Sequence, residues 1–137
     1  MEQGNGDCQA SVQHKLLIVD DEVKIGQVLA KHFSLNGYDV RTAYGGEEAL
    51  AVAKDFHPQV VLLDLLMPRM TGVNTLKGLK QLTPPPKVLM LSAMDHEGVI
   101  KDLLQLGADF YICKPIVFSE LDSVVENFCA DGESPHS

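Results

Sequence analysis

The chain has 137 residues, of which 45% are hydrophobic and 22% charged, a composition typical of one globular domain with a hydrophobic core. Eleven Lys and Arg against nineteen Asp and Glu give a net charge of -8, which argues against direct binding to nucleic acid or to an anionic membrane. No run approaches the roughly 18 apolar residues of a membrane span and the N-terminus has no signal-peptide pattern, so the sequence predicts a cytoplasmic protein.

Five short apolar runs alternate with longer amphipathic stretches along the chain. Residues 1–14 and 131–137 are polar and aperiodic, so we expect flexible tails, the second of which could also begin a linker, around a folded part at 15–130. The apolar runs predict strands at residues 15–19, 38–43, 59–63, 87–91 and 110–113. Because these strands are apolar on both faces and separated by helices, they predict an α/β fold with a parallel sheet covered on both sides.

Apolar residues recur at helical spacing in each intervening stretch, which predicts one buried stripe on each helix. The stripes comprise Ile25, Val28, Leu29 and Phe33, then Leu50, Ala53 and Phe56, then Leu76 and Leu79, then Val99, Ile100, Leu103 and Leu104, and finally Leu121, Val124, Val125 and Phe128. Gly37, after Asn36, and Gly107 are typical of helix C-terminal caps. The run Pro84-Pro85-Pro86 cannot continue a helix and predicts a stiff loop.

Reactive side chains follow four of the five predicted strands. Asp20 and Asp21 come after the first strand, Asp64 after the third, Ser92 after the fourth and Lys114 after the fifth. In open parallel sheets ligands bind at the carboxyl ends of the strands, so we expect these groups to meet at one edge. The second strand ends without such a group, as expected of an edge strand remote from a site.

Three carboxylates at one edge repel one another unless a cation offsets their charge. Oxygen ligands without Cys or His favour Mg²⁺, for which Mn²⁺ could substitute. A carboxylate such as Asp64 can attack a phosphorus centre and form an acyl phosphate when cations neutralise the transferring oxygens. Lys114 is placed to supply one such charge, and Ser92 could donate a hydrogen bond to the phosphoryl group once it is present.

Four segments closely resemble the receiver domain of two-component response regulators, the CheY-like family. They read LIVDDE at 17–22, LDLLMPRMTG at 63–72, MLSA at 90–93 and GADFYICKP at 107–115, in the family's order and with about its separations. The likeness covers nearly the whole folded part. It implies a doubly wound (βα)5 flavodoxin-like fold with the strand order 2-1-3-4-5.

The resemblance also implies a role for each motif residue. Asp64 corresponds to the phosphoacceptor, and Asp20 and Asp21 correspond to the metal-binding acids. The remaining positions correspond to a metal-binding backbone carbonyl, the switch hydroxyl, the switch aromatic and the phosphate-binding lysine, which are Leu66, Ser92, Tyr111 and Lys114 in that order. A cis peptide is implied between Lys114 and Pro115.

Departures from the family's pattern leave these reacting groups in place. Thr71 stands where the family often has Asp, Ser92 where Thr is common, and Ile116 where Phe is common. The resemblance implies that the side chains at Leu66 and Met94 modulate how quickly the acyl phosphate hydrolyses.

The resemblance implies a sensor histidine kinase or a histidine phosphotransfer protein as the phosphoryl donor. The signal would leave through the surface of the helix at about 94–106, the last strand and the last helix, toward a downstream protein or an output domain. A phosphorylation-dependent homodimer is also compatible with this arrangement.

The sequence predicts a phosphoacceptor module that is not a turnover enzyme. Two other functions are the alternatives. A degenerate receiver would serve only as a protein-binding module, but it would normally have lost an acid or the lysine. A Mg²⁺-dependent aspartyl phosphatase would need an acid two residues after its nucleophile, where this chain has Leu66. We therefore favour the phosphoacceptor.

Overall fold

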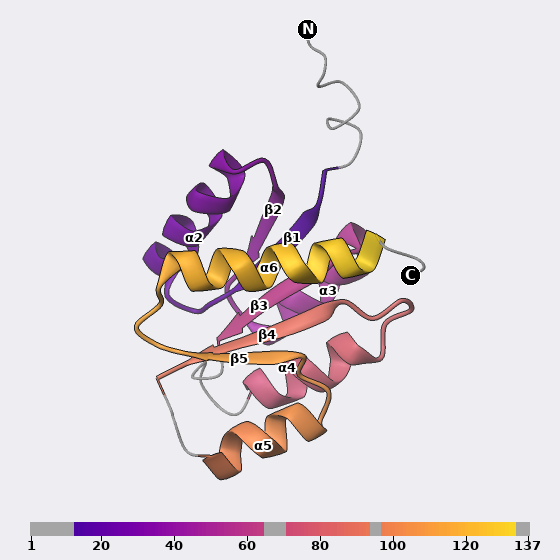
Figure 1. Ribbon diagram of the computed structural model, residues 1–137. Helices are drawn as coiled ribbons and strands as arrows, with labels where there is room; N and C mark the ends of the chain where they lie inside the picture. Colours follow the sequence, from indigo (N-terminus) through magenta and orange to yellow (C-terminus); the bar gives the residue numbers. More distant parts are fainter. Residues whose placement is uncertain (1–12, 65–70, 94–96, 134–137) are drawn as a thin grey trace, which may run out of the picture.

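The computed structural model describes residues 13–64, 71–93 and 97–133, in which strands and helices alternate. The elements are β1 (Lys15–Val19), α2 (Val23–Leu35), β2 (Asp39–Ala43), α3 (Gly46–Phe56), β3 (Val60–Asp64), α4 (Thr71–Lys80), β4 (Lys87–Ser92), α5 (Glu97–Gln105), β5 (Phe110–Cys113) and α6 (Phe118–Glu133) (Figure 1). The predicted alternation is confirmed. The tails expected at 1–14 and 131–137 lie mostly outside the described residues, and these domain boundaries stay a prediction.

The five strands form one parallel sheet in the order β2-β1-β3-β4-β5, which confirms the expected fold and strand order. Strands β3 and β4 each run one residue further than predicted, so Asp64 and Ser92 are their last residues. Asp64 still pairs with Leu91 in the ladder, because a parallel ladder continues as long as its neighbour does, whatever the polarity of the side chain.

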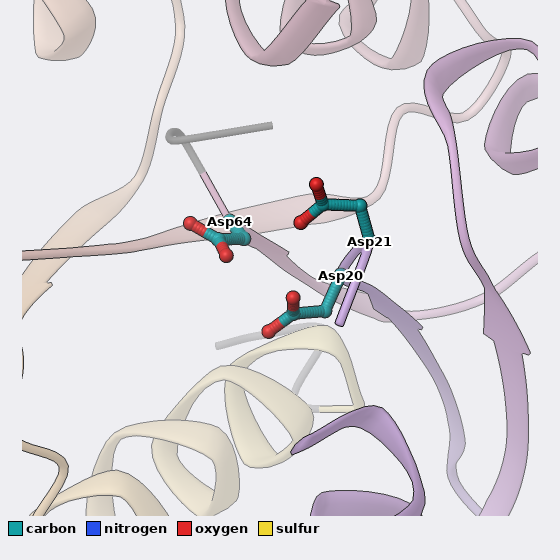
Figure 2. A group of neighbouring side chains, drawn as sticks. All are labelled: Asp20, Asp21 and Asp64. Atoms are coloured by element: carbon teal, nitrogen blue, oxygen red, sulfur yellow. The ribbon is translucent and has the colours of Figure 1, made fainter. Parts of the chain in front are cut away.

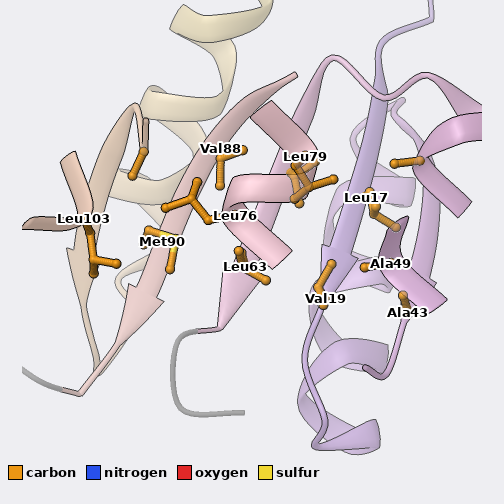
Figure 3. Packing of buried hydrophobic residues seen from close by; sticks show 13 residues of the cluster. Leu17, Val19, Ala43, Ala49, Leu63, Leu76, Leu79, Val88, Met90 and Leu103 are labelled. Carbon is orange, nitrogen blue, oxygen red and sulfur yellow. The ribbon is translucent and has the colours of Figure 1, made fainter. Parts of the chain in front are cut away.

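Helices cover both faces of the sheet and enclose two cores. Helices α3, α4 and α5 cover one face, where the buried cluster draws on all three of them and on the strands (Figure 3). Helices α2 and α6 cover the other face, over a cluster that includes Phe33, Leu62 and Val125. Because strand side chains alternate between faces, Leu17 and Val19 enter the first core while Leu16 and Ile18 enter the second.

Two of the predicted helix ends are confirmed by their backbone. Gly37 and Gly107 have φ of 95° and 119°, values that suit glycine, after α2 and α5. Helix α3 is capped at its C-terminus by His57 with φ of 54°, an end that the sequence did not reveal. Among the described residues, no helix has the length and hydropathy needed to cross a membrane.

The prediction was wrong for two residues that the sequence placed on buried helix stripes. Val28 is 58% exposed and Leu104 is 44% exposed, whereas the neighbouring Leu29 and Leu103 are buried. Consecutive residues on a helix point about 100° apart, so only one of each apolar pair faces the sheet. In α2 the buried positions are Gly26, Leu29 and Phe33, a narrower stripe than the sequence predicted.

Candidate functional site

Four strands deliver polar side chains to one edge of the sheet. Asp20 directly follows β1, Asp64 ends β3, Ser92 ends β4 and Lys114 follows β5. Strands β1 and β3 are neighbours in register, with Val19 beside Leu63, so Asp20 and Asp64 lie next to each other. The expected meeting of strand ends is therefore what the topology produces.

Asp20, Asp21 and Asp64 converge on a common space (Figure 2). One carboxylate oxygen from each lies within 4.8 Å of the others. Asp20 and Asp64 are only 2% and 3% exposed, whereas Asp21 is exposed. Burying two carboxylates at such close range is unfavourable without a compensating cation.

The first acid is held in place by its own turn and by the neighbouring strand. The backbone N–H of Asp20 donates to the carbonyl oxygen of Ala43 over 3.1 Å, which ties the end of β1 to the end of β2. The N–H of Glu22 donates to Oδ1 of Asp20 over 2.9 Å. The N–H of Glu22 thus orients the Asp20 carboxylate, while the bond to Ala43 holds the backbone of Asp20.

Lys114 reaches the acids from the end of β5. Its Nζ donates to Oδ2 of Asp64 over 3.3 Å, and its backbone N–H donates to the carbonyl oxygen of Ser92 over 2.7 Å. The peptide between Lys114 and Pro115 is cis, as the resemblance implied. The lysine therefore places one positive charge beside the carboxylate of Asp64.

The electrostatics of the cluster favour a bound cation. Burial raises the pKa of Asp20 from 3.8 to about 6, and the negative charge of Asp64 adds to this rise. The N–H of Glu22 and the charge of Lys114 oppose the rise without cancelling it. Three carboxylates face one lysine, and their oxygens are the ligands that Mg²⁺ prefers, so the residues present fit this metal.

Of the remaining predicted site residues, the structure describes two and does not describe the other two. Ser92 is fully buried at the end of β4, and Tyr111 is half-buried in β5 with its side chain packed against the core under α3, α4 and α5. Leu66, expected to offer a carbonyl, and Met94, expected to modulate hydrolysis, lie outside the described residues.

The end of β2 is closer to the site than the sequence suggested. That strand is at the sheet edge, as predicted, but Ala43 hydrogen-bonds to Asp20, so its end is not remote from the acids. The contact follows from register, in which Val19 pairs with Ala43. The sequence did not reveal this register, because the register of an edge strand is set by its pairing with the neighbouring strand in the folded sheet.

Comparison with known proteins assigns the family. The protein-family model described as "Response regulator receiver domain" matches residues 16–126. The chain belongs to the response regulator receiver domain family. Receiver domains are phosphoacceptor modules of two-component signalling and bind Mg²⁺ at a cluster of aspartates, and the acidic group at this sheet edge is a candidate for such a cluster.

Individual relatives agree with this assignment. The receiver domain is 39% identical over 112 residues to the alkaline phosphatase synthesis transcriptional regulatory protein PhoP of Bacillus subtilis, covering 82% of this chain and 47% of PhoP. It superposes on the Francisella response regulator 1452 receiver domain with a TM-score of 0.81 and 32% identity, over 88% of this chain and 99% of that one.

A further solved structure is CheY of Borrelia burgdorferi in a complex with CheX, BeF₃ and Mg²⁺. It matches with a TM-score of 0.76 and 32% identity, over 83% of this chain and 87% of that one. Several of the curated relatives are longer, and this chain spans about half of their length. The comparisons therefore assign this chain to the receiver domain family. They do not assign to it the activities of the longer relatives.

Proposed function

We propose that this receiver domain accepts a phosphoryl group on Asp64 and thereby switches the surface it offers to a partner. The observation that carries the proposal is the convergence of Asp64 with two further carboxylates and with Nζ of Lys114. Asp64 is the carboxylate that lies between the acid pair and the lysine. A nucleophile placed between a metal-binding pair and a cation matches what phosphoryl transfer requires.

In the proposed step, a carboxylate oxygen of Asp64 forms a bond to the phosphorus of the donor as the bond to the donor's leaving atom breaks. The product is an acyl phosphate on Asp64, which water later hydrolyses back to the carboxylate. Lys114, now 3.3 Å from Asp64, would contact a phosphoryl oxygen and balance its charge. The chain thus undergoes self-phosphorylation and autodephosphorylation and does not turn over a separate substrate.

Asp20, Asp21 and Asp64 would hold Mg²⁺, and the carbonyl of Leu66 would complete the protein ligands. Mg²⁺ supplies charge neutralisation for the oxygens of the transferring group. The oxygen-only ligand set supports this assignment, and the BeF₃ and Mg²⁺ recorded with CheY of Borrelia burgdorferi support it by analogy. Mn²⁺ favours the same ligands and would substitute.

Ser92 and Tyr111 would convert phosphorylation into a change of surface. The hydroxyl of Ser92 would donate to the phosphoryl group, a contact that exists only in the phosphorylated state, and would shift the equilibrium toward that state. Tyr111 would follow by changing its rotamer. The face formed by α5, β5 and α6 suits an output surface because Leu104, Leu106 and Phe110 are exposed on it.

The proposed phosphoryl donor is a sensor histidine kinase or a histidine phosphotransfer protein, since the relatives are regulators with output domains. The exposed face named above would bind a downstream protein, an output domain or a second phosphorylated copy. The cytoplasmic location expected from the sequence stays a prediction, as does the absence of direct nucleic-acid binding by this domain.

Incubation with acetyl phosphate and Mg²⁺, followed by intact mass measurement, tests the proposal. We expect one added phosphoryl group on the wild-type protein and on Asp55→Asn, which changes an exposed acid of α3 away from the sheet edge. We expect none on Asp64→Asn or without a divalent metal. A stable adduct on Asp64→Asn would overturn the assignment, and a wild-type protein that stays unlabelled would favour a degenerate receiver that only binds proteins.

A further inference from the structure

Tyr44 lies beside the turn that carries the first two acids. It directly follows Ala43, whose carbonyl oxygen accepts the hydrogen bond from the N–H of Asp20 over 3.1 Å. The chain therefore turns away from β2 at the point where β2 is tied to the start of the acidic turn. Tyr44 is thus the next residue after the one to which the start of the acidic turn is bonded.

Two hydrogen bonds hold Tyr44 in place. Its backbone N–H donates to Oε1 of Glu48 in the first turn of α3 over 2.9 Å. Its phenol oxygen accepts from Oγ1 of Thr42 over 3.3 Å, and the residue is half-buried. The phenol is thus bonded to Thr42 of β2 and the backbone of Tyr44 to Glu48 of α3, and neither bond involves Asp20, Asp21 or Asp64.

The ring lies near α2 at Gly26, where that helix has no side chain. A Cβ built on Gly26 would lie 3.5 Å from Cε1 of Tyr44, an ordinary van der Waals distance, so the ring borders the space in front of Gly26. The N–H of Gly26 donates to the carbonyl oxygen of Glu22 over 3.1 Å, and the N–H of Glu22 donates to Oδ1 of Asp20 over 2.9 Å. The ring therefore lies near Gly26, and two hydrogen bonds lead from Gly26 through Glu22 to the buried carboxylate.

We infer that Tyr44 is a positioning residue for the metal-binding turn and acts through Gly26 and Glu22. The inference rests on the proposed Mg²⁺ site. Asp21 is exposed, so its position depends on the path of the turn more than on packing around its own side chain. Mg²⁺ requires near-ideal octahedral geometry at about 2.0 to 2.1 Å, so a small displacement of the turn weakens its binding.

This role of Tyr44 predicts that Mg²⁺ binding and the rate of phosphoryl labelling respond differently to its removal. The groups assigned to phosphoryl transfer, Asp64 and Lys114, come from β3 and from the end of β5, and Tyr44 packs against neither of these strands in the contacts described above. Removing the ring should therefore raise the dissociation constant for Mg²⁺ while the labelling rate at saturating Mg²⁺ stays near the wild-type value. General loss of structure would lower both.

Titration of ¹⁵N-labelled protein with Mg²⁺, followed by NMR, tests this role. We expect Tyr44→Ala to raise the dissociation constant about tenfold, the lower end of what loss of an outer support costs a metal site, and Tyr44→Phe to stay within about twofold. Tyr38→Ala is the matched control, because Tyr38 precedes β2 at its other end and packs against Phe33, away from the acids. It should lower stability without changing the dissociation constant.

Gly26→Leu tests the same contact from α2 if Tyr44→Ala fails to fold. It retains Tyr44 but places a side chain where the ring lies, so it too should weaken Mg²⁺ binding. An unchanged dissociation constant in the folded Tyr44 or Gly26 variant, or an equal rise in Tyr38→Ala, would overturn the inference while the Mg²⁺ site stands. A wild-type protein that neither binds Mg²⁺ nor labels at Asp64 would instead overturn the proposed function.

Discussion

Replacing Asp20 by Asn should change how stability depends on pH in the absence of metal. Burial raises the pKa of Asp20 in the folded protein to about 6, against 3.8 in the unfolded chain. The folded state therefore binds the proton more tightly than the unfolded state does. This contribution to stability is fully present below the unfolded pKa of 3.8 and is lost as the pH rises through about 6.

The size of the effect follows from the two pKa values. At about 1.4 kcal/mol for each pH unit between them, the metal-free wild type should lose about 3 kcal/mol between about pH 4 and about pH 7. Asn has nearly the same shape and does not titrate, so Asp20→Asn lacks this loss. Its free energy of unfolding should rise relative to the wild type by about that amount over the same range.

Urea denaturation followed by circular dichroism in EDTA, repeated across this pH range, measures the difference. Added Mg²⁺ should stabilise the wild type above about pH 6, where Asp20 is ionised, and should do so far less in Asp20→Asn. Comparing the two proteins at each pH removes the contribution of the acids that do not interact with Asp20. If the difference in the free energy of unfolding between the two proteins stays constant with pH, the argument that burial raises the pKa of Asp20 is refuted.

Three further substitutions test the described structure by urea denaturation. Gly26→Ala should stabilise the protein by about 0.5 to 1 kcal/mol, because Ala favours a helix interior and its Cβ meets Tyr44 at an ordinary distance; a loss of stability would show that the space is smaller. Gly37→Ala should cost about 1 kcal/mol or more, because φ there is 95°, and an unchanged value would contradict that backbone. His32→Ala should lower the free energy of unfolding by about 1 to 2 kcal/mol, because His32 bonds to Asp122 of α6 over 2.7 Å. An unchanged free energy would show that this bond does not stabilise the fold.

Most of the fold could be predicted from the sequence because its three central strands, β1, β3 and β4, are apolar on both faces. Runs such as residues 60–63 have no solvated side, so they specify a parallel sheet between two helical layers. The gathering of Asp20, Asp64 and Lys114 then follows from topology, since the carboxyl ends of parallel strands share one edge. These features depend on local pattern and on strand order alone.

What the sequence could not reveal depends on register and on the rotation of helices. Val28 and Leu104 are as apolar as the buried residues beside them, and only the packing angle of each helix decides which one faces the sheet. The closeness of Tyr44 to the acidic turn requires β2 to pair with β1 so that Ala43 meets Val19. The burial of Asp20 likewise depends on the elements around it, so its raised pKa could not be read from the motif.

The most direct test of the central claim is to locate the phosphoryl group on the chain. The protein is loaded with acetyl phosphate and Mg²⁺ and treated with borohydride, which reduces an aspartyl phosphate to homoserine, and its peptides are then sequenced by mass spectrometry. We predict homoserine in place of Asp64, with Asp20 and Asp21 unchanged. Homoserine at either of those acids, or none at Asp64 in protein that carries the phosphoryl group, would contradict the account.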